Sequence, residues 1–310
     1  MKSSKRANVI NGWVVIDKAK NTTSSYVTAR TKKILHAKKA GHAGTLDPLG
    51  TGVLPIALGE ATKTISYVVD KFKHYKFTVR WGEERDSDDA EGAVINVSNE
   101  RPCEDEIRSA LCNFTGEIDQ IPPRYSALKI NGERAYKLAR AGREFNLPSR
   151  KVLVKEFTLL DLPNANFAEF EVVCGKGTYI RSLTRDLGRK LGVFSHITQL
   201  RRIKCGPFFE KNAISLETLQ ALVHSAPPYT YLCKVESALD DIPALDLNAW
   251  QAGYLRQGRS IAVHDLVSAN PIGTSLSVKG RVFCAKADGI PVAIVRILAG
   301  KLHVVRLLKL

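Results

Sequence analysis

Alternating hydrophobic and polar residues predict strands at several places along the chain. The clearest pattern covers residues 73–82, where Tyr75, Phe77, Val79 and Trp81 share one face and polar residues occupy the other. On this pattern alone, Tyr75 is a buried structural tyrosine whose hydroxyl finds a partner. Further strands are predicted at residues 12–18, 93–97, 152–160, 167–174 and 199–203.

Segments with helical spacing separate these strands. Hydroxyl residues at 22–25 can cap a helix that runs to about residue 36 and turns Tyr26, Val27, Ile34 and Leu35 inward. Its other face and the residues after it are basic, with Arg30, Lys32, Lys33, Lys38 and Lys39. Other helices are predicted at residues 103–114, 132–141 and 215–223, and one follows a glycine-bounded turn at 175–181 and ends near residue 191.

Composition changes after residue 225. The Ala226-Pro227-Pro228 break and the mixed residues up to 243 predict a linker. Beyond it, short apolar stretches separated by glycine and aspartate turns predict a small β-rich domain, with strands at 261–263, 281–284, 291–295 and 303–307. We therefore expect two domains, residues 1–235 and 245–310. The acidic segment after Gly82 is expected to be a solvated connection between two strands.

Residues 40–54 combine four glycines, a histidine and one carboxylate in a segment too irregular for a helix or strand. Glycine adopts backbone conformations that other residues avoid, and the Asp47-Pro48 step favours a turn. The sequence therefore predicts a structured loop that presents Asp47 just before the apolar residues 53–58. Asp47 is then either a catalytic carboxylate or a turn residue that only accepts a bond from a backbone amide.

The charge indicates a polyanionic partner. The 310 residues have a formal net charge of +15 and are 44% hydrophobic, which suits a large folded core. Residues 1–63 hold eleven Lys and Arg against three Asp and Glu, and residues 245–310 hold nine against three. Nucleic acid is the expected partner, although a basic composition can also reflect general solubility.

Several other classes of protein are disfavoured. The six cysteines are widely spaced, so neither a disulfide framework nor a zinc site is indicated, and the seven histidines show no metal-ligand spacing. The Gly175–Thr178 stretch lacks the spacing of a phosphate-binding loop, and no dinucleotide fingerprint is present. No apolar run reaches membrane-spanning length. We expect a cytoplasmic protein without metal, cofactor or membrane partner.

The 41–63 segment closely resembles the signature of TruB-type tRNA pseudouridine-55 synthases. The matching residues are Gly41-His42-Ala43-Gly44-Thr45-Leu46-Asp47-Pro48, Thr51-Gly52 and Gly59-Glu60-Ala61-Thr62-Lys63. Further matches occur in the same order, at Gly12–Lys18, at Tyr75, at 121–129, at Lys176-Gly177-Thr178-Tyr179-Ile180-Arg181 and at Leu200-Arg201-Arg202. The resemblance implies an α+β fold with a mixed, mostly antiparallel central sheet, flanking helices and a C-terminal PUA-like RNA-binding domain.

The resemblance also implies the site. Asp47 would be the nucleophile that isomerises an extruded uridine in the T-arm of tRNA, attacking either the ribose or the uracil ring. The residues implied in substrate binding are His42, Tyr75, Tyr179, Arg181 and Leu200, with Arg181 as the cation beside Asp47. Lys18, Lys63 and Lys129 are lesser candidates for phosphate or scaffold contacts. We expect a monomer, and the alternative function is a non-catalytic protein that binds tRNA and assists its folding.

Overall fold

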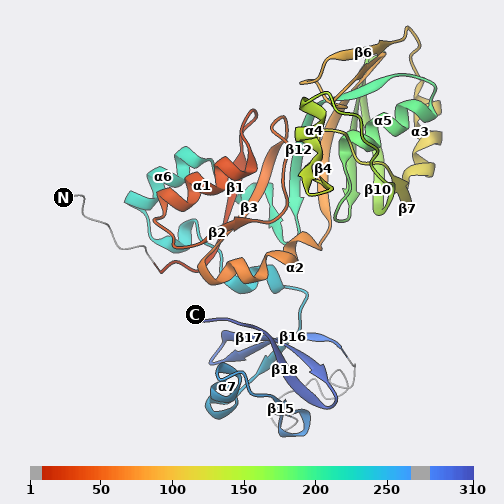
Figure 1. Ribbon diagram of the computed structural model, residues 1–310. Coiled ribbons are helices and arrows are strands. Elements are labelled where there is room, and N and C mark those ends of the chain that lie inside the picture. Colours follow the sequence, from red (N-terminus) through yellow and green to blue (C-terminus); the bar gives the residue numbers. More distant parts are fainter. Residues whose placement is uncertain (1–8, 267–279) are drawn as a thin grey trace.

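The computed structural model describes residues 9–266 and 280–310, and one large sheet forms its centre (Figure 1). The main strands are β1 (Gly12–Lys18), β3 (Thr51–Leu58), β4 (Lys73–Trp81), β7 (Gly116–Gln120), β10 (Arg150–Asn164), β11 (Phe167–Cys174) and β12 (Ser195–Cys205). In the described chain they pair in the order β1-β3-β12-β4-β11-β10-β7. Two short strands, β2 (Ala40–His42) and β13 (Phe208–Phe209), pair with β3 and β12, respectively. The β12–β3 pairing is parallel, and the other pairings in this sheet are antiparallel.

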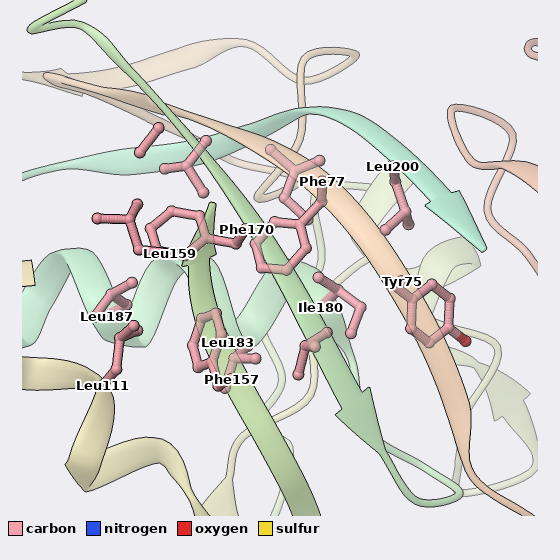
Figure 2. Packing of buried hydrophobic residues seen from close by; sticks show 14 of the residues in the cluster. Tyr75, Phe77, Leu111, Phe157, Leu159, Phe170, Ile180, Leu183, Leu187 and Leu200 are labelled. Atoms are coloured by element: carbon pink, nitrogen blue, oxygen red, sulfur yellow. The ribbon is translucent and has the colours of Figure 1, made fainter. Parts of the chain in front are cut away.

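One half of the sheet packs against helices α3 (Glu104–Leu111) and α5 (Ile180–Lys190). The face predicted for β4 is confirmed, because Phe77, Val79 and Trp81 are buried in this cluster. Phe77 stacks on Phe170 of β11 at a centroid distance of 5.5 Å, an aromatic pair that adds to the burial energy. Figure 2 shows Tyr75 and Leu200 at one end of the cluster, away from the helices.

The other half of the sheet is covered by α1 (Ser24–Ile34) and α6 (Leu216–Ser225), which lie side by side in Figure 1. Thr23 caps α1, as the hydroxyl cluster predicted, because its side chain accepts a bond from the Tyr26 amide. Val27 and Leu35 are buried as expected, but Tyr26 is 52% exposed, so its predicted inward orientation is wrong. The buried stripe of α1 is Ser24, Val27 and Thr31, and Tyr26 lies about 100° around the helix from Val27.

The predicted C-terminal β-rich unit is confirmed. Its strands are β14 (Ala244–Asp246), β15 (Ile261–Ala262), β16 (Val282–Ala287), β17 (Ile290–Leu298) and β18 (Lys301–Leu307), paired in the order β14-β16-β17-β18-β15. Helix α7 (Ala249–Arg256) packs on this sheet and was not predicted. A capping box formed by Asn248 and Gln251 starts it.

The segment 226–243 is not the free linker that its prolines suggested. Cys233 pairs with Trp13 of β1 through two backbone bonds of 2.8 Å, and Val235 and Leu239 are buried. One apolar cluster contains Trp13, Val235 and Leu239 together with Leu308 beyond β18. The two sheets are therefore joined through a shared apolar contact.

Two other local predictions need correction. The acidic segment after Gly82 does form a hairpin, between β5 (Glu83–Arg85) and β6 (Val94–Val97), but Ser87, Asp88 and Asp89 of its connection are buried rather than solvated. The helix expected at 132–141 begins only at α4 (Ala135–Arg140), because the preceding residues pair as β8 (Lys129–Ile130) and β9 (Glu133–Arg134). The remaining short elements are α2 (Ile65–Val69) and the 3-10 turns Gly59–Thr64, Cys112–Phe114, Glu210–Asn212, Pro228–Thr230, Val235–Leu239 and Val263–Leu266.

The α+β class is therefore confirmed, with a mostly antiparallel sheet, flanking helices and a C-terminal β-rich unit. Within residues 9–266 and 280–310, no helix combines the length and the apolar character needed to cross a bilayer. Strands β3, β4 and β12, together with the start of α5, surround the region that contains Asp47.

Candidate active site

The Asp47 loop connects β2 to β3 and is held in place from below. Ser24 of α1 bonds both backbone groups of Leu46, accepting from its amide at 2.9 Å and donating to its carbonyl at 3.0 Å. Lys18 is fully buried beneath the turn and donates to the carbonyls of Thr22 at 2.7 Å and Pro48 at 3.2 Å. These bonds hold the loop in one conformation, and this fixes the position of the Asp47 carboxylate.

Gly52 explains why the loop must leave at this angle. Its φ is +94°, and a Cβ atom at this position would lie 2.3 Å from the carbonyl oxygen of Arg202 on β12. Only glycine combines this backbone conformation with so close an approach. The parallel pairing of β3 with β12, which places the Asp47 loop beside Leu200, depends on that contact.

Asp47 and Arg181 form an ion pair although they are 134 residues apart in the chain. The Arg181 Nε donates to the Asp47 carboxylate at 2.9 Å, and the Asp47 side chain remains 31% exposed. Arg181 is buried, and its other donors go to the carbonyls of Ser87 and Tyr125, each at 2.9 Å. Burial lowers the pKa of Arg181, but Asp47 and then Asp89 outweigh this effect and raise it overall. The guanidinium is therefore a permanent positive charge beside the carboxylate.

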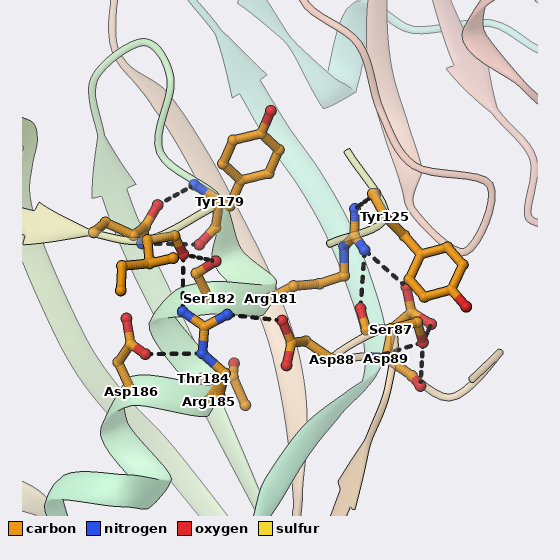
Figure 3. Close-up of polar contacts among 12 residues, drawn as sticks. Ser87, Asp88, Asp89, Tyr125, Tyr179, Arg181, Ser182, Thr184, Arg185 and Asp186 are labelled. Atoms are coloured by element: carbon orange, nitrogen blue, oxygen red, sulfur yellow. Dashed lines mark hydrogen bonds and ion pairs between the residues drawn. The ribbon is translucent and has the colours of Figure 1, made fainter. Parts of the chain in front are cut away.

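Arg181 is one of three arginines on α5 that pair with the acidic hairpin, and Figure 3 shows Arg181 and Arg185 with the hairpin residues Ser87, Asp88 and Asp89. Arg185 pairs with Asp88 at 3.0 Å and Arg189 with Glu84 at 3.0 Å, while Asp89 lies 3.6 Å from Arg181. Burial raises the pKa of Asp88 to about 6, against the opposing effect of Arg185. The sequence reading missed these partners because a run of acidic residues usually lies in water. The available signal was the spacing of three arginines at every fourth residue, which places them on one helix face.

A cavity of about 240 Å³ lies against the Asp47 loop and collects most of the predicted site residues. The cavity is lined by Asp47, Tyr75, Tyr179 and Leu200. Arg181 is not among the lining residues but bonds the Asp47 carboxylate. The 121–129 segment, which matched the family motifs, contributes Ser126 and Ala127 to the wall. Residues from five distant parts of the chain thus meet around a space large enough for one nucleobase.

Tyr75 and Tyr179 belong to different secondary-structure elements. Tyr75 lies on β4, and burial raises its pKa to about 12. Tyr179 is the N-cap residue of α5, and the side chain of Gln120 bonds its amide at 2.8 Å and its carbonyl at 3.1 Å. Burial also raises the pKa of Tyr179, with Asp47 as a smaller contribution in the same direction. Both phenols are therefore neutral donors at physiological pH.

His42 is not among the residues that line this cavity. It lies on β2, opposite Ile56 of β3, and its Nδ1 atom is buried without a hydrogen-bond partner in the described part of the chain. Burial, followed by the charge of Arg202, lowers its pKa, so the ring is neutral. The structure thus brings five of the six predicted site residues together and leaves His42 beside the loop.

The three lesser lysine candidates occupy different environments. Lys18 is fully buried and cannot reach a phosphate, so it belongs to the scaffold. Lys63 pairs with Glu60 at 2.6 Å and donates to the Leu307 carbonyl at 2.7 Å, which ties β18 to the turn after β3. Lys129 is exposed on β8, where it can meet solvent or a ligand. Among residues 9–266 and 280–310, no cluster of three His, Cys, Asp or Glu is placed to hold a metal ion.

A carboxylate paired with a buried arginine beside a base-sized cavity agrees with the class implied by the motifs, the pseudouridylate synthases. A chain in the crystal structure of a Cbf5-Nop10-Gar1 complex has the same fold, with a TM-score of 0.74 and 26% identity over 97% of this chain and 85% of that one. Residues 32–180 match the TruB family pseudouridylate synthase N-terminal domain, and residues 181–241 match the tRNA pseudouridylate synthase B C-terminal domain. The chain belongs to the TruB family, which confirms the resemblance seen in the sequence.

Curated relatives match along the whole chain. A tRNA pseudouridine synthase B of Rhodospirillum rubrum is 46% identical over 310 residues, and one of Caulobacter vibrioides is 43% identical over 310 residues. In both cases the match covers 100% of each protein.

Proposed function

We propose that this protein isomerises uridine 55 in the T-arm of tRNA to pseudouridine, with Asp47 as the nucleophile. The observation that supports this most directly is the Asp47–Arg181 pair at 2.9 Å beside the cavity that Tyr75, Tyr179 and Leu200 also line. Membership of the TruB family and relatives named tRNA pseudouridine synthase B support tRNA as the substrate. The net charge of +15 suits a polyanionic RNA.

The chemistry requires a nucleophile that adds and leaves reversibly in a space that excludes water. The glycosidic bond breaks, the uracil turns within the pocket, and carbon 5 of the ring joins the ribose. The Asp47 carboxylate can attack either the anomeric carbon or the uracil ring, and the buried Arg181 guanidinium lies 2.9 Å from it, so that a positive charge stands beside the attacking group. The overall reaction oxidises no atom and hydrolyses no bond.

The substrate must enter as an extruded nucleotide, at a cost of a few kcal/mol. We assign Tyr75 to stacking on the uracil and Leu200 to the apolar wall beside it, since both line the cavity. We assign Tyr179, which lines the same cavity, to help remove the proton from carbon 5 of the uracil ring. We assign His42 to the space near the extruded nucleotide, where a neutral ring on β2 can pack beside the loop.

Two other functions fit the residues less well. A protein that only docks and folds tRNA would need the same positive charge, but it would not need a carboxylate ion-paired with a buried arginine. A glycosidase would need a second carboxylate to activate water. Asp89 lines a second cavity together with Asp47, but its Oδ1 atom already accepts from Ser87 at 2.6 Å and from the Glu91 amide at 3.0 Å.

The domain assignment is part of the same proposal. We assign residues 1–235 to catalysis and residues 245–310 to a PUA-like RNA-binding module in a monomeric protein. The C-terminal unit has its own apolar cluster and is tied to the first through Lys63 and Leu307.

The test is to incubate the purified chain with unmodified tRNA and map pseudouridine by nucleotide. We expect one modified position, in the T-arm. A T-arm stem-loop with cytidine at the target position is the control and should remain unmodified. Release of free uracil instead of pseudouridine would refute the isomerase proposal in favour of the glycosidase, and tight binding without modification would favour the docking protein.

A further inference from the structure

Two buried cations in the cavity wall have no carboxylate partner among the residues that the structure describes. Arg202 of β12 is 1% exposed and Lys73 of β4 is 5% exposed, and both line the cavity that contains Asp47. In the described ranges, neither is within ion-pair distance of an acidic side chain, whereas Arg181 and Arg185 each have a carboxylate within 3.0 Å. Burying an uncompensated charge is costly, so a protein that keeps two of them in one pocket wall gains something from an anionic group there.

The bonds of these two cations orient them but do not neutralise them. Arg202 donates through Nε to the Val53 carbonyl at 2.7 Å and through Nη2 to the Gly44 carbonyl at 3.0 Å. Lys73 donates to the carbonyls of Val69 and of Lys71, the second at 2.6 Å. Gly44 has a φ of +93° and no Cβ, and this allows the Arg202 guanidinium to lie against the Asp47 loop. The cations are therefore fixed before any substrate enters.

Their position relates them to the base rather than to the outer surface. Arg202 is the register partner of Tyr75, and its guanidinium carbon lies 6.0 Å from the centre of the tyrosine ring. Leu200 precedes Arg202 by two residues and shares its strand face, so the apolar wall and the cation follow each other along β12. A ring stacked on Tyr75 would thus have Arg202 beside its edge.

We propose that Arg202, assisted by Lys73, forms an oxyanion subsite for the carbonyl oxygens of the uracil ring when that ring carries negative charge. This inference rests on the isomerase function proposed above. If Asp47 bonds the anomeric carbon, the bond between that carbon and N1 breaks and its electron pair passes to the ring. If Asp47 instead adds to carbon 6, the electron pair moves to the oxygen on carbon 4, and the bond between the anomeric carbon and N1 then breaks while Asp47 stays bonded to the ring. Both routes put negative charge on ring oxygens before carbon 5 bonds the anomeric carbon. Asp47 then leaves, carbon 5 loses its proton and N1 takes up a proton, so the product is an isomer of the substrate.

The same cations could in principle hold the phosphate of the extruded nucleotide, because both ligands present anionic oxygens. The ring is the better match, since Arg202 is almost fully buried beside Tyr75, whereas the exposed Lys176 at the same cavity is paired with Asp70 at 2.8 Å. Preorganised donors aimed at developing charge act most strongly in such a water-poor position.

The experiment compares Arg202→Met and Arg202→Lys with Arg201→Met. Arg201 is the adjacent residue, lies outside the Asp47 cavity and pairs with Asp17 and Glu210 at the surface, so it controls for loss of a charge on the same strand. Each full-length variant is first checked by thermal unfolding. Single-turnover rates are then measured with a T-arm stem-loop that carries uridine or 5-fluorouridine at the target, reading the disappearance of that nucleoside.

We expect Arg202→Met to slow consumption of uridine on the order of 100-fold, as for removal of one oxyanion donor, with RNA affinity unchanged. Arg202→Lys should recover part of the rate, and Arg201→Met should keep it. Because fluorine stabilises the ring anion by itself, the loss for 5-fluorouridine should be smaller, below about tenfold. Equal losses on both substrates would mean that Arg202 only supports the Asp47 loop, and would overturn the proposal.

A second arm separates the two anions. Stem-loops with a methylphosphonate on either side of the target uridine remove the phosphate charge, and the effect of Arg202→Met should persist with them. Disappearance of the effect would assign the cation to phosphate and refute the ring subsite. If Arg202→Met fails to fold, Lys73→Met is measured in its place with the same substrates and the same criteria. Absence of pseudouridine with the unmodified protein would instead refute the isomerase function itself.

Discussion

Replacing Asp47 with asparagine removes the charge and the nucleophile while keeping the shape of the side chain. The amide oxygen can still accept from the Arg181 Nε, and Arg181 keeps its bonds to the Ser87 and Tyr125 carbonyls at 2.9 Å and its contact with Asp89 at 3.6 Å. Since the Asp47 side chain is 31% exposed, solvent screens the lost attraction. We expect the free energy of unfolding to fall by only about 1 kcal/mol.

Turnover should respond very differently. An amide cannot form the reversible bond to the nucleotide, so Asp47→Asn should lower kcat by roughly 10⁴-fold or more, as for loss of other nucleophiles. Affinity for RNA should stay nearly unchanged, because the removed charge is negative and contributes no attraction to the phosphates. The two quantities together distinguish a chemical role from a structural one.

The assay follows tritium released from carbon 5 of labelled uridine in tRNA, with binding measured separately on the same RNA. Asp161→Asn is a matched control, because Asp161 lies on β10 outside the cavity and its carboxylate accepts from the Leu162 amide at 2.8 Å. It should release tritium at the normal rate. Normal release by Asp47→Asn would refute the assignment of the nucleophile and with it the role given to Arg181.

Four other perturbations test the remaining parts of the site. Tyr75→Ala should weaken RNA binding by about 1 to 3 kcal/mol, the value of one base stack, and unaltered affinity would return Tyr75 to a purely structural role. Gly52→Ala should lower the melting temperature and the activity, because its Cβ would collide with the Arg202 carbonyl at 2.3 Å, and a fully active, stable variant would contradict that contact. Burial lowers the pKa of Lys18 from 10.5 to about 8, so between these pH values the unfolded chain binds more protons. The difference in the free energy of unfolding between the unmodified protein and Lys18→Met should therefore rise with pH across this window, by at most about 1.4 kcal/mol per pH unit. A difference that does not change with pH would show that folding does not lower the pKa of Lys18. Binding of tRNA should weaken steeply as salt rises, and a salt-independent affinity would count against the basic surface as the RNA contact.

Much of the fold could be predicted because local patterns decide it. Alternation along β4 identified the buried face that carries Phe77 and Trp81, and the hydroxyl residues before α1 located its N-cap at Thr23. Tyr26 and the segment 226–243 were misread, because the orientation of a single helix residue and the burial of a proline-rich segment depend on what packs against them. Helix α7 was missed because its polar cap, Asn248 with Gln251, follows a strand without a clear break.

The candidate site divides in the same way. The motifs identified Asp47, Tyr75, Tyr179 and Leu200, which line one cavity, and Arg181, which bonds Asp47 there. They also identified His42, which does not line that cavity. The acidic hairpin was read as solvated although Asp88 and Asp89 are buried against α5. Charge runs are normally hydrated, and only the arrival of Arg181 and Arg185 makes burial of these carboxylates favourable.

The sequence by itself determined which residues alternate on a strand, where helices begin, that a glycine-rich loop presents Asp47, and to which family the chain belongs. These properties depend on neighbours within a few positions or on a motif that is read directly. Which charges are paired follows only from the folded arrangement: Arg181 pairs with Asp47, whereas Arg202 has no carboxylate partner within residues 9–266 and 280–310. Such outcomes depend on distances between residues more than a hundred positions apart, and on how much water remains around each charge once the sheet and helices have packed.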